Sequence, residues 1–173
     1  MSLFQPQAVL RPPIPNDGAS VFRLIDRCPP LDTNSMYCNL LQCTHFAGTS
    51  VAALQTVDTN EEMVGFISAY LVPEREDALF VWQVAVDERA RGTGLAGRML
   101  KHILDRPLCR HVRYLETTIT ESNKASWGVF NSLAKKLETT LDRSVMFDGD
   151  KHLGGAHDTE FLARIGPFKL AQS

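Results

Sequence analysis

Apolar positions recur along the chain with two different periods, and these periods predict its secondary structure. Runs rich in β-branched and aromatic residues are typical of strands, whereas apolar residues spaced three or four apart are typical of helices. The second and third expected strands form an antiparallel hairpin around a polar turn at residues 58–61. In chain order, the segments expected to be strands are 8–11, 48–57, 63–72, 78–86, 112–119, 141–147 and 159–165.

Four helices are expected between these strands, and polar or glycine residues mark where they begin. The first expected helix starts at Asn16 or Asp17 and ends near Arg27, and the second starts at Asp32, Thr33 or Asn34. The third follows the glycines of segment 92–97 and stops before Pro107. The fourth runs from Glu121 or Ser122 to about Leu137. The side chains expected to face inward are Met36, Leu40, Leu41 and Cys43 from the second helix, and Trp127, Phe130, Leu133 and Leu137 from the fourth.

The resulting order, β-α-α-β-β-β-α-β-α-β-β, is typical of a mixed α/β fold. A chain of 173 residues can bury a substantial core in one domain, and it shows no internal repeat or linker that would divide it. We therefore assign residues 8–173 to a single domain and expect residues 1–7 to be a disordered start. Segment 148–156 is expected to be a flexible loop, and the acidic residues Glu74, Glu76 and Asp77 a solvated turn.

Charge and composition exclude several classes of protein. A net charge of −2 gives no indication of a basic surface for nucleic acid. No apolar run approaches the ~18 residues that span a membrane, and the first residues lack a signal-peptide pattern, so we expect a cytoplasmic protein. The cysteines form no C-x-x-C pair, which indicates neither a metal site nor a disulfide framework. We expect reduced, partly buried thiols at Cys28, Cys38, Cys43 and Cys109.

Three glycines open the third expected helix, directly after the strand 78–86 and a charged turn at 87–91. The first N–H groups of a helix have no intrahelical partner, the helix dipole is positive there, and glycines let an anion approach the backbone. Gly92, Gly94 and Gly97 therefore predict a site for a phosphate-bearing cofactor. The simpler alternative is a tight turn between a strand and a surface helix.

These residues fit two cofactor patterns. Segment 92–97 matches G-x-G-x-x-G, which is typical of dinucleotide folds, and Glu116 lies at a suitable distance for a ribose-binding acid. In such folds, however, the glycine turn follows the first strand and parallel βαβ units continue beyond it. Here three antiparallel strands precede the turn, 76 residues follow Gly97, and Glu116 lies in the middle of a strand. A nicotinamide cofactor is therefore disfavoured.

The same turn also reads R-x-x-G-x-G over residues 89–94, after the strand end Val84-Ala-Val86. This pattern resembles the acetyl-CoA site of the GNAT superfamily of N-acetyltransferases. The resemblance implies a mixed, mostly antiparallel sheet of six to seven strands with about four helices, splayed between the fourth and fifth strands. It also implies that turn amides hold the CoA diphosphate and that the splayed strand pairs with the pantetheine arm. The implied cofactor-binding residues are Val84, Val86, Arg89, Arg91, Gly92, Thr93, Gly94, Leu95, Ala96, Asn123 and Trp127.

Further stretches resemble one member family, the L-2,4-diaminobutyrate acetyltransferases, from end to end of the chain. These stretches are Leu10-Arg-Pro-Pro13 and the segments 28–46, 50–52, 80–86, 117–123 and 155–161. The resemblance implies acetylation of the γ-amine of L-2,4-diaminobutyrate, the acetylation step of ectoine biosynthesis, by a homodimer. A diamino acid needs acids for its ammonium groups, and Asp32, Glu160 and Tyr37 are available at positions where the family motifs match. Trp82 is expected to form a wall of the amine pocket, and His157 and Glu160 are expected to bind and orient the diamine.

Each of these residues also has a structural interpretation. Asp32 could instead cap a helix, Tyr37 could be half-buried packing, and Trp82 could be a core aromatic rather than a wall of the amine pocket. His157 could be satisfied structurally. It would meet Glu160 only if the chain bends between them.

The expected chemistry is direct attack of the amine on acetyl-CoA, since no cysteine lies in a convincing nucleophile context. Glu160 or His157 is the expected base, and a backbone N–H at Val84 is expected to stabilise the oxyanion. The superfamily tyrosine that protonates the thiolate is replaced by Phe130, so Tyr37 or another group donates, or the thiolate leaves unassisted. The alternatives are an acetyltransferase for another small amine and a non-catalytic acyl-CoA-binding module.

Overall fold

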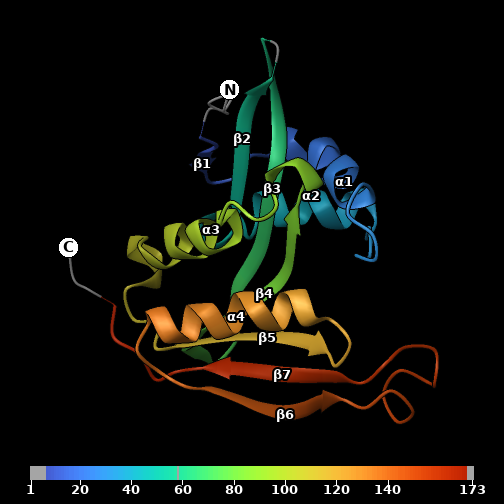
Figure 1. Cartoon of the computed structure of the whole chain (residues 1–173), viewed down its shortest axis with the longest axis vertical. Helices are drawn as coiled ribbons and strands as arrows, with labels where there is room; N and C mark the ends of the chain where they lie inside the picture. The colour runs from blue at the N-terminus through green and yellow to red at the C-terminus, as the bar shows by residue number, and fades with distance from the viewer. Residues whose placement is uncertain (1–6, 58, 171–173) are drawn as a thin grey trace. The chain divides into compact units, whose positions relative to one another are not determined.

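The structure is a computed structural model that describes residues 7–57 and 59–170. Most of the expected disordered start, residues 1–6, lies outside the described residues, as does Asp58 of the expected hairpin turn. The order of helices and strands predicted from the sequence is confirmed over the described residues (Figure 1). In chain order these are β1 (Val9–Arg11), α1 (Gly18–Asp26), α2 (Met36–Thr44), β2 (Val51–Val57), β3 (Asn60–Val72), β4 (Arg75–Val86), α3 (Leu95–Leu104), β5 (Tyr114–Thr120), α4 (Lys124–Lys136), β6 (Leu141–Phe147) and β7 (Glu160–Ile165).

The strands hydrogen-bond in the order β1-β2-β3-β4-β5-β7-β6. The pairs β1–β2, β2–β3, β5–β7 and β6–β7 are antiparallel, whereas β4–β5 is parallel, so the expected mixed sheet is confirmed. The parallel pairing joins Ala78–Val81 to Tyr114–Thr117, although β4 continues to Val86 and β5 to Thr120. Pairing over only part of both strands agrees with the expected splay.

The chain folds as two compact units that both use β3 and β4. The first unit comprises the described residues up to Ala69 together with 83–108, and its core lies between α1, α2 and strands β2 to β4. Helix α3 packs on β2, and Gly65 admits Met99 because a Cβ at that glycine would lie 3.0 Å from the Met99 sulfur. The core residues are Val21, Leu24, Ile25, Cys28, Cys43, Ala52, Leu54, Met63, Phe66 and Ala85.

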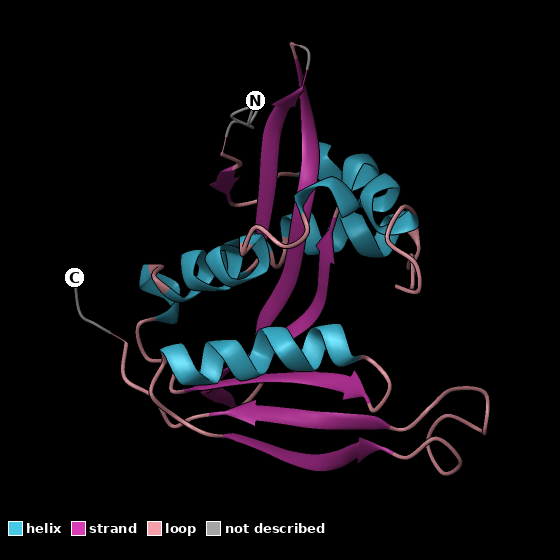
Figure 2. Ribbon diagram, in the orientation of Figure 1, coloured by secondary structure: helices cyan, strands magenta, loops and turns pink. Residues whose placement is uncertain are grey.

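The second unit comprises residues 70–82 and the described residues from Cys109 onward. Strands β5, β7 and β6 run side by side, and α4 packs on β6 and β7 (Figure 2). Glu116 is only 2% exposed in this unit. Both of its oxygens accept hydrogen bonds from Arg75, at 2.9 and 2.8 Å, and Arg164 lies 3.4 Å away. Glu116 therefore belongs to a buried ion-pair group, which further disfavours the ribose-binding role.

The boundaries of β4 differ from those expected. Arg75, Glu76 and Asp77 lie in the strand, so the acidic turn reduces to Pro73 and Glu74, where Glu74 has φ +65°. Glu74 and Glu76 are exposed, as a solvated segment requires. The prediction of a turn at Asp77 is wrong because its backbone carbonyl accepts the N–H of Arg113 at 2.8 Å and holds it to the sheet.

The prediction for α2 is wrong in its cap and in part of its buried face, although Cys43 is buried as predicted. Ser35 caps the helix by accepting the N–H of Cys38 at 3.0 Å, rather than Asp32, Thr33 or Asn34. Met36 and Leu40 are exposed, whereas Asn39, Gln42 and Cys43 are buried. The helix contacts α1 and the 3-10 turn Pro15–Asp17, and Leu40 lies against Gly18, where an added Cβ would be 2.6 Å from the Leu40 Cδ2. Apolar spacing alone does not reveal that Asn39 and Gln42 are buried.

The fourth helix starts later than predicted. Asn123 is its N-cap, accepting the N–H of Ser126 at 3.1 Å, so the helix begins at Lys124 instead of Glu121 or Ser122. Phe130 and Leu133 are buried as expected, whereas Leu137 is a half-buried C-cap and Ala134 is buried in its place. No disulfide joins the four cysteines of the described chain, and three of them are buried.

Candidate active site

The glycine turn of the first unit has the backbone geometry that an anion site requires. Strand β4 ends at Val86, the 3-10 turn Glu88–Ala90 follows, and Gly94 is the N-cap of α3. Gly92 and Gly94 have φ of +73° and +74°, a region that side chains other than glycine rarely adopt. A Cβ at Gly92 would meet no atom within 4 Å, so the space beside this glycine is open. A phosphate can therefore approach both this turn and the unpaired amides of α3.

Side chains around the turn hold its shape. Thr93 donates its hydroxyl to the Ala90 carbonyl at 2.8 Å, and Arg98 donates to the Thr93 carbonyl at 2.7 Å. A hollow of about 220 Å³ lies beside these residues and is also lined by Leu95 and Val64. Arg98 was missed at the sequence level, although its place one helical turn after Gly94 was a usable signal.

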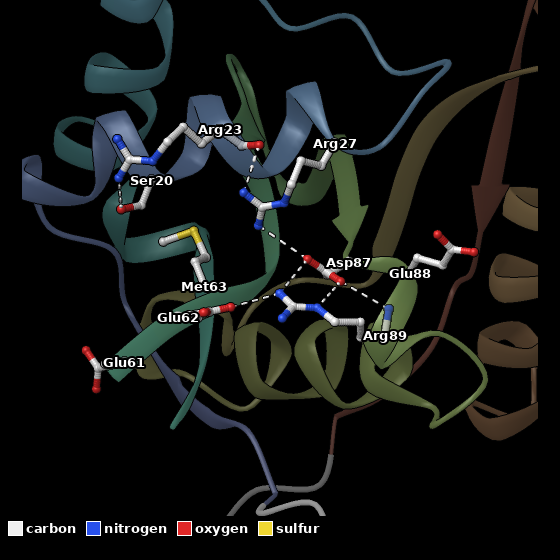
Figure 3. A pocket seen from close by; sticks show the side chains of 9 residues that line it. All are labelled: Ser20, Arg23, Arg27, Glu61, Glu62, Met63, Asp87, Glu88 and Arg89. Carbon is white, nitrogen blue, oxygen red and sulfur yellow. Dashed lines mark hydrogen bonds and ion pairs between the residues drawn. The ribbon is translucent and has the colours of Figure 1, made fainter. Parts of the chain in front are cut away.

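Two arginines expected to contact the cofactor are engaged by the protein itself. Arg91 donates its Nε to the Val86 carbonyl at 3.2 Å. Arg89 donates to Asp87 through Nε, at 2.9 Å, and through Nη2, at 3.1 Å, and Nη2 also lies 2.9 Å from Glu62 (Figure 3). These bonds within the protein explain where both side chains lie. Contact of Arg89 or Arg91 with a phosphate therefore stays a prediction.

Asp32 and Tyr37 lie in the first unit, and both are exposed. The Asp32 side chain accepts the N–H of Asn34 at 3.0 Å, and its carbonyl accepts Nε2 of Gln83 at 2.7 Å. Gln83, which was missed at the sequence level, thus fixes the Asp32 loop to β4. An amide in the middle of an otherwise apolar strand was its signal. Tyr37 is 70% exposed, so the interpretation as half-buried packing is wrong, as is the helix-cap interpretation of Asp32.

Trp82, His157 and Glu160 lie in the second unit. Trp82 is 43% exposed and meets Tyr70 edge-on, with ring centroids 6.5 Å apart and planes at 89°. The core interpretation of Trp82 is therefore wrong, and its ring is available to a ligand. Glu160 is half-buried where β7 begins and pairs in register with Thr120 of β5. His157 is exposed and lies at a bend just before β7.

The loop that carries His157 is tied by backbone contacts. Gly149 donates its N–H to the Thr159 hydroxyl at 3.0 Å and accepts the N–H of Gly155 at 2.8 Å. A Cβ at Gly149 would lie 2.7 Å from the His157 carbonyl, so this position requires glycine. Among the hydrogen bonds and ion pairs described for this loop, none joins the side chains of His157 and Glu160.

Asn123 and Trp127 lie together at the start of α4, also in the second unit. Trp127 donates its indole N–H to the Thr120 carbonyl at 3.0 Å, and the Arg143 guanidinium lies 5.1 Å from the ring centroid. The Asn123 cap uses the amide oxygen. The NH₂ of the same amide can donate a hydrogen bond to a carbonyl of the cofactor. Phe130 is buried within the helix face and offers no proton to a thiolate.

The first unit thus brings together the cofactor turn of residues 84–96 and, through Gln83, the Asp32 loop. The second unit brings together Asn123 with Trp127, and Trp82 with Tyr70. The described residues contain no group of three or more His, Cys, Asp or Glu side chains that could hold a metal ion. None of the helices described is long and apolar enough to cross a membrane.

Comparisons with known proteins show which family the chain belongs to. A model of the acetyltransferase (GNAT) family matches residues 19–134. An L-2,4-diaminobutyric acid acetyltransferase from Methylotuvimicrobium alcaliphilum is 55% identical over 168 residues, covering 97% of this chain and 95% of that protein. A protein of the same name from Bordetella parapertussis is 48% identical over 97% of this chain and 91% of its own length.

Solved structures extend the comparison. Diaminobutyrate acetyltransferase EctA from Paenibacillus lautus, in complex with its substrate L-2,4-diaminobutyric acid and coenzyme A, is 35% identical, with a TM-score of 0.87 over 96% of this chain and 99% of that chain. The ribosomal-protein-S18-alanine N-acetyltransferase from Escherichia coli, at 16% identity and a TM-score of 0.67, shares the fold alone. The chain belongs to the GNAT family of acetyltransferases and, within it, to the family of L-2,4-diaminobutyric acid acetyltransferases.

Proposed function

We propose that this protein transfers the acetyl group of acetyl-CoA to the γ-amine of L-2,4-diaminobutyrate, giving N-γ-acetyl-L-2,4-diaminobutyrate. The observation that carries the proposal is the glycine turn, in which two left-handed glycines precede α3. The chain that bears this turn is 55% identical to an L-2,4-diaminobutyric acid acetyltransferase. The Paenibacillus relative binds both the diamine and coenzyme A. The reaction is the acetylation step of ectoine biosynthesis, which supplies a compatible solute under osmotic stress.

The first unit supplies the diphosphate site of this proposal. The amides of Gly92, Thr93, Gly94, Leu95 and Ala96 face the anion, because the first amides of α3 have no intrahelical partner. Val84 and Val86 lie beyond the residues of β4 that pair with β5. The backbone of Val84 and the N–H of Val86 pair with the amides of the pantetheine arm, whereas the Val86 carbonyl already accepts Arg91 and Cys28. In the second unit, the Asn123 NH₂ and the Trp127 ring contact the pantetheine side of the cofactor.

The diamine carries two ammonium groups, and carboxylates recognise them. Asp32 and Glu160 supply those charges, Tyr37 and His157 supply hydrogen bonds, and the Trp82 face attracts an ammonium through its ring quadrupole. Support comes from exposure, since Asp32, Tyr37 and Trp82 all present their side chains to solvent.

The chemical step requires a neutral amine, because an alkyl ammonium with a pKa near ~10 has no lone pair to donate. Glu160, or His157 through water, accepts the ammonium proton. The amine nitrogen then forms a bond to the thioester carbon, and the backbone N–H of Val84 stabilises the oxyanion. Collapse breaks the carbon–sulfur bond and releases the CoA thiolate, while the second ammonium proton passes from the nitrogen to solvent water. Tyr37 donates a proton to the thiolate, or the thiolate leaves unassisted, because Phe130 has no proton to give.

The experiment that tests the proposal is incubation of the purified protein with acetyl-CoA and L-2,4-diaminobutyrate, with mass spectrometry of the product. Stoichiometric release of CoA thiol and fragmentation that places the acetyl group on Nγ are the expected results. Acetylation of Nα would overturn the regiochemistry, and turnover with another amine alone would identify a different acetyltransferase. Tight CoA binding without turnover on any amine would identify a binding module.

The family resemblance also leads us to propose a homodimer that works in the cytoplasm. The edge strand β6 supports the dimer, because Val145, Met146 and Phe147 expose apolar side chains along it. The cysteines of the described residues form no disulfide, which is consistent with a reducing compartment.

A further inference from the structure

The first unit holds a polar cavity of about 640 Å³ that the proposed reaction does not use. Helix α1 forms one wall, the start of β3 another, and the segment that follows β4 the third (Figure 3). Three arginines and four carboxylates share this space. Ion pairs join Arg27 to Asp87, and Arg89 to both Asp87 and Glu62. Its lining residues are Ser20, Arg23, Arg27, Glu61, Glu62, Met63, Asp87, Glu88 and Arg89.

Asp87 is the residue on which these walls converge. It is 4% exposed, yet it is ionised, because the hydrogen bonds from the Arg89 side chain, helped by the Arg89 N–H and by Arg27, lower the pKa of its carboxyl to about 2. Oδ1 accepts the Arg89 backbone N–H at 3.0 Å and Arg89 Nε at 2.9 Å. Oδ2 accepts Arg89 Nη2 at 3.1 Å and Arg27 Nη2 at 3.3 Å.

The backbone of Asp87 is held as firmly as its side chain. Its N–H donates to the Val64 carbonyl of β3 at 2.9 Å, and its carbonyl accepts the N–H of Ala90 at 2.9 Å. One aspartate therefore joins α1, β3 and the 3-10 turn Glu88–Ala90. That turn leads directly to Gly92 and Gly94, the two glycines with left-handed backbone at the proposed diphosphate site.

Arg89 lies three residues before Gly92, but its guanidinium faces Asp87 and Glu62 (Figure 3). A guanidinium committed to two carboxylates within 2.9 Å holds less positive charge for a phosphate. The same bonds are well placed to fix the backbone at residue 89, because the carboxylate grips both its N–H and its side chain.

We propose that Asp87 is a positioning residue for the acetyl-CoA diphosphate, and that Arg89 acts through Asp87 rather than by contact with the phosphate. This inference rests on the proposed function, since it assigns the glycine turn to acetyl-CoA. Without the carboxylate, segment 87–91 loses its charge-assisted bonds to Arg27 and to the Arg89 side chain, and the turn amides leave their alignment. A misplacement of about 1 Å at a binding group can lower efficiency by about 100-fold.

A truncated acetyl donor separates this role from a general loss of structure. Acetyl-pantetheine carries the thioester and the pantetheine arm but lacks the diphosphate and the adenosine. Asp87→Asn should therefore raise the KM for acetyl-CoA by about 10- to 100-fold and leave kcat/KM for acetyl-pantetheine within about 2-fold of wild type. Equal losses with both donors would overturn the proposal, because they would show damage beyond the diphosphate site.

A matched control is available in the same unit. Asp17 is 7% exposed and is also held by an arginine, with Arg11 Nη1 at 2.7 Å and Nη2 at 2.9 Å, but its bonds lie at the start of α1. Asp17→Asn should lower the melting temperature as Asp87→Asn does and leave the KM for acetyl-CoA unchanged. An equal rise in that KM for both variants would contradict a specific role for Asp87.

A double-mutant cycle tests the link between Asp87 and Arg89. If Arg89 acts through Asp87, the double variant Asp87→Asn/Arg89→Gln should bind acetyl-CoA no more weakly than the single variant with the lower affinity. Effects that multiply would show that Arg89 contacts the phosphate itself and would overturn that part of the proposal. Arg27→Gln, which removes one half-exposed contact, should raise the same KM in the same direction by a smaller factor, even where Asp87→Asn fails to fold.

Binding measurements keep the inference separable from the proposed function. Titration calorimetry with CoA and with pantetheine needs no turnover, so it reads the diphosphate contribution directly. A protein that binds CoA but acetylates no diamine would refute the proposed function and leave this test valid. Loss of CoA affinity in Asp87→Asn, with pantetheine affinity retained, is the expected result, and unchanged CoA affinity would refute the inference.

Discussion

At the scale of single residues, Trp82 gives a direct test of where the diamine binds. Its ring is exposed and braced edge-on by Tyr70, so Trp82→Ala removes a surface for the ammonium without opening the core. A cation–π contact contributes about 0.5–2 kcal/mol, so we expect the KM for diaminobutyrate to rise roughly 2- to 30-fold. The KM for acetyl-CoA should change little. Steady-state kinetics with each substrate varied in turn would measure both.

The matched variant at this position is Trp82→Phe, which keeps an aromatic face and should recover most of the loss. Diamine kinetics that stay at the wild-type value in Trp82→Ala would show that the amine pocket lies elsewhere.

The thiols give a second expectation at this scale. Burial raises the pKa of the Cys43 thiol to about 12, so it stays protonated, and therefore unreactive, at pH 8. Cys28 is also buried and donates its S–H to the Val86 carbonyl, whereas Cys38 is half-exposed. We expect iodoacetamide to alkylate Cys38 first, as measured by mass spectrometry of peptides from the native protein. Faster labelling of Cys43 than of Cys38 would contradict the burial described here.

Some site residues could be found from the sequence and others could not, and the difference lies in where their partners are. The glycine turn is local, because the strand, the glycines and the helix follow one another within 20 residues, and so the motif revealed it. Asp87 and Gln83 depend on Arg27 and Asp32, 60 and 51 positions away. No periodicity or motif reports such a contact, so a charged turn and an apolar strand were all that the pattern indicated.

At the scale of helices and strands, Asn123 combines two roles that one pair of variants separates. The amide oxygen caps α4, and the NH₂ is the group proposed to contact the cofactor. Asn123→Asp keeps a capping oxygen and places a negative charge at the helix N-terminus, so it should preserve stability while raising the KM for acetyl-CoA. Asn123→Ala should do both, lowering the free energy of unfolding by about 1 kcal/mol.

Thermal unfolding and acetyl-CoA kinetics of the two variants supply the measurements. A wild-type KM in Asn123→Asp would assign the residue to capping alone.

Apolar spacing placed all the elements in order because their cores are apolar, but the helix boundaries depend on single side chains. Ser35 rather than Asp32 caps α2, and Asn123 rather than Glu121 caps α4, since several neighbouring residues could have accepted the same N–H. Part of the predicted buried face of α2 was wrong for a related reason. Asn39 is buried there and donates to the Thr33 carbonyl at 3.3 Å, a polar contact that only the folded loop provides.

Asp87 also gives stability a defined dependence on pH. Hydrogen bonds from Arg89 depress the carboxyl pKa from 3.8 to about 2 in the folded state. Stability from the ionised carboxylate is therefore fully present above about pH 4 and is lost as the pH falls toward 2. Because both arginines are half-exposed, we expect at most about 2 kcal/mol from this source.

Urea unfolding would measure the difference in unfolding free energy between wild type and Asp87→Asn. This difference should begin to shrink as the pH falls below the ordinary carboxyl pKa of about 4, and it should be smaller at pH 2 than at pH 5. A difference that stayed constant over this range would show that the carboxylate charge adds no stability.

At the scale of the whole molecule, the two edges of the strand order predict how copies associate. Strand β6 lies at one end and exposes Val145, Met146 and Phe147, whereas β1 at the other end is three residues long. An exposed strand edge with apolar side chains is the usual place for a second chain to add, and a charge among those side chains prevents pairing. We expect sedimentation velocity to give a mass about twice the chain mass of 19.3 kDa, and Val145→Lys to give the single-chain mass.

Val9→Lys is the control, because it places the same charge on the exposed β1 edge and should leave the dimer intact. A wild-type monomer would refute the dimer, and a Val145→Lys variant that stays dimeric would move the interface away from β6.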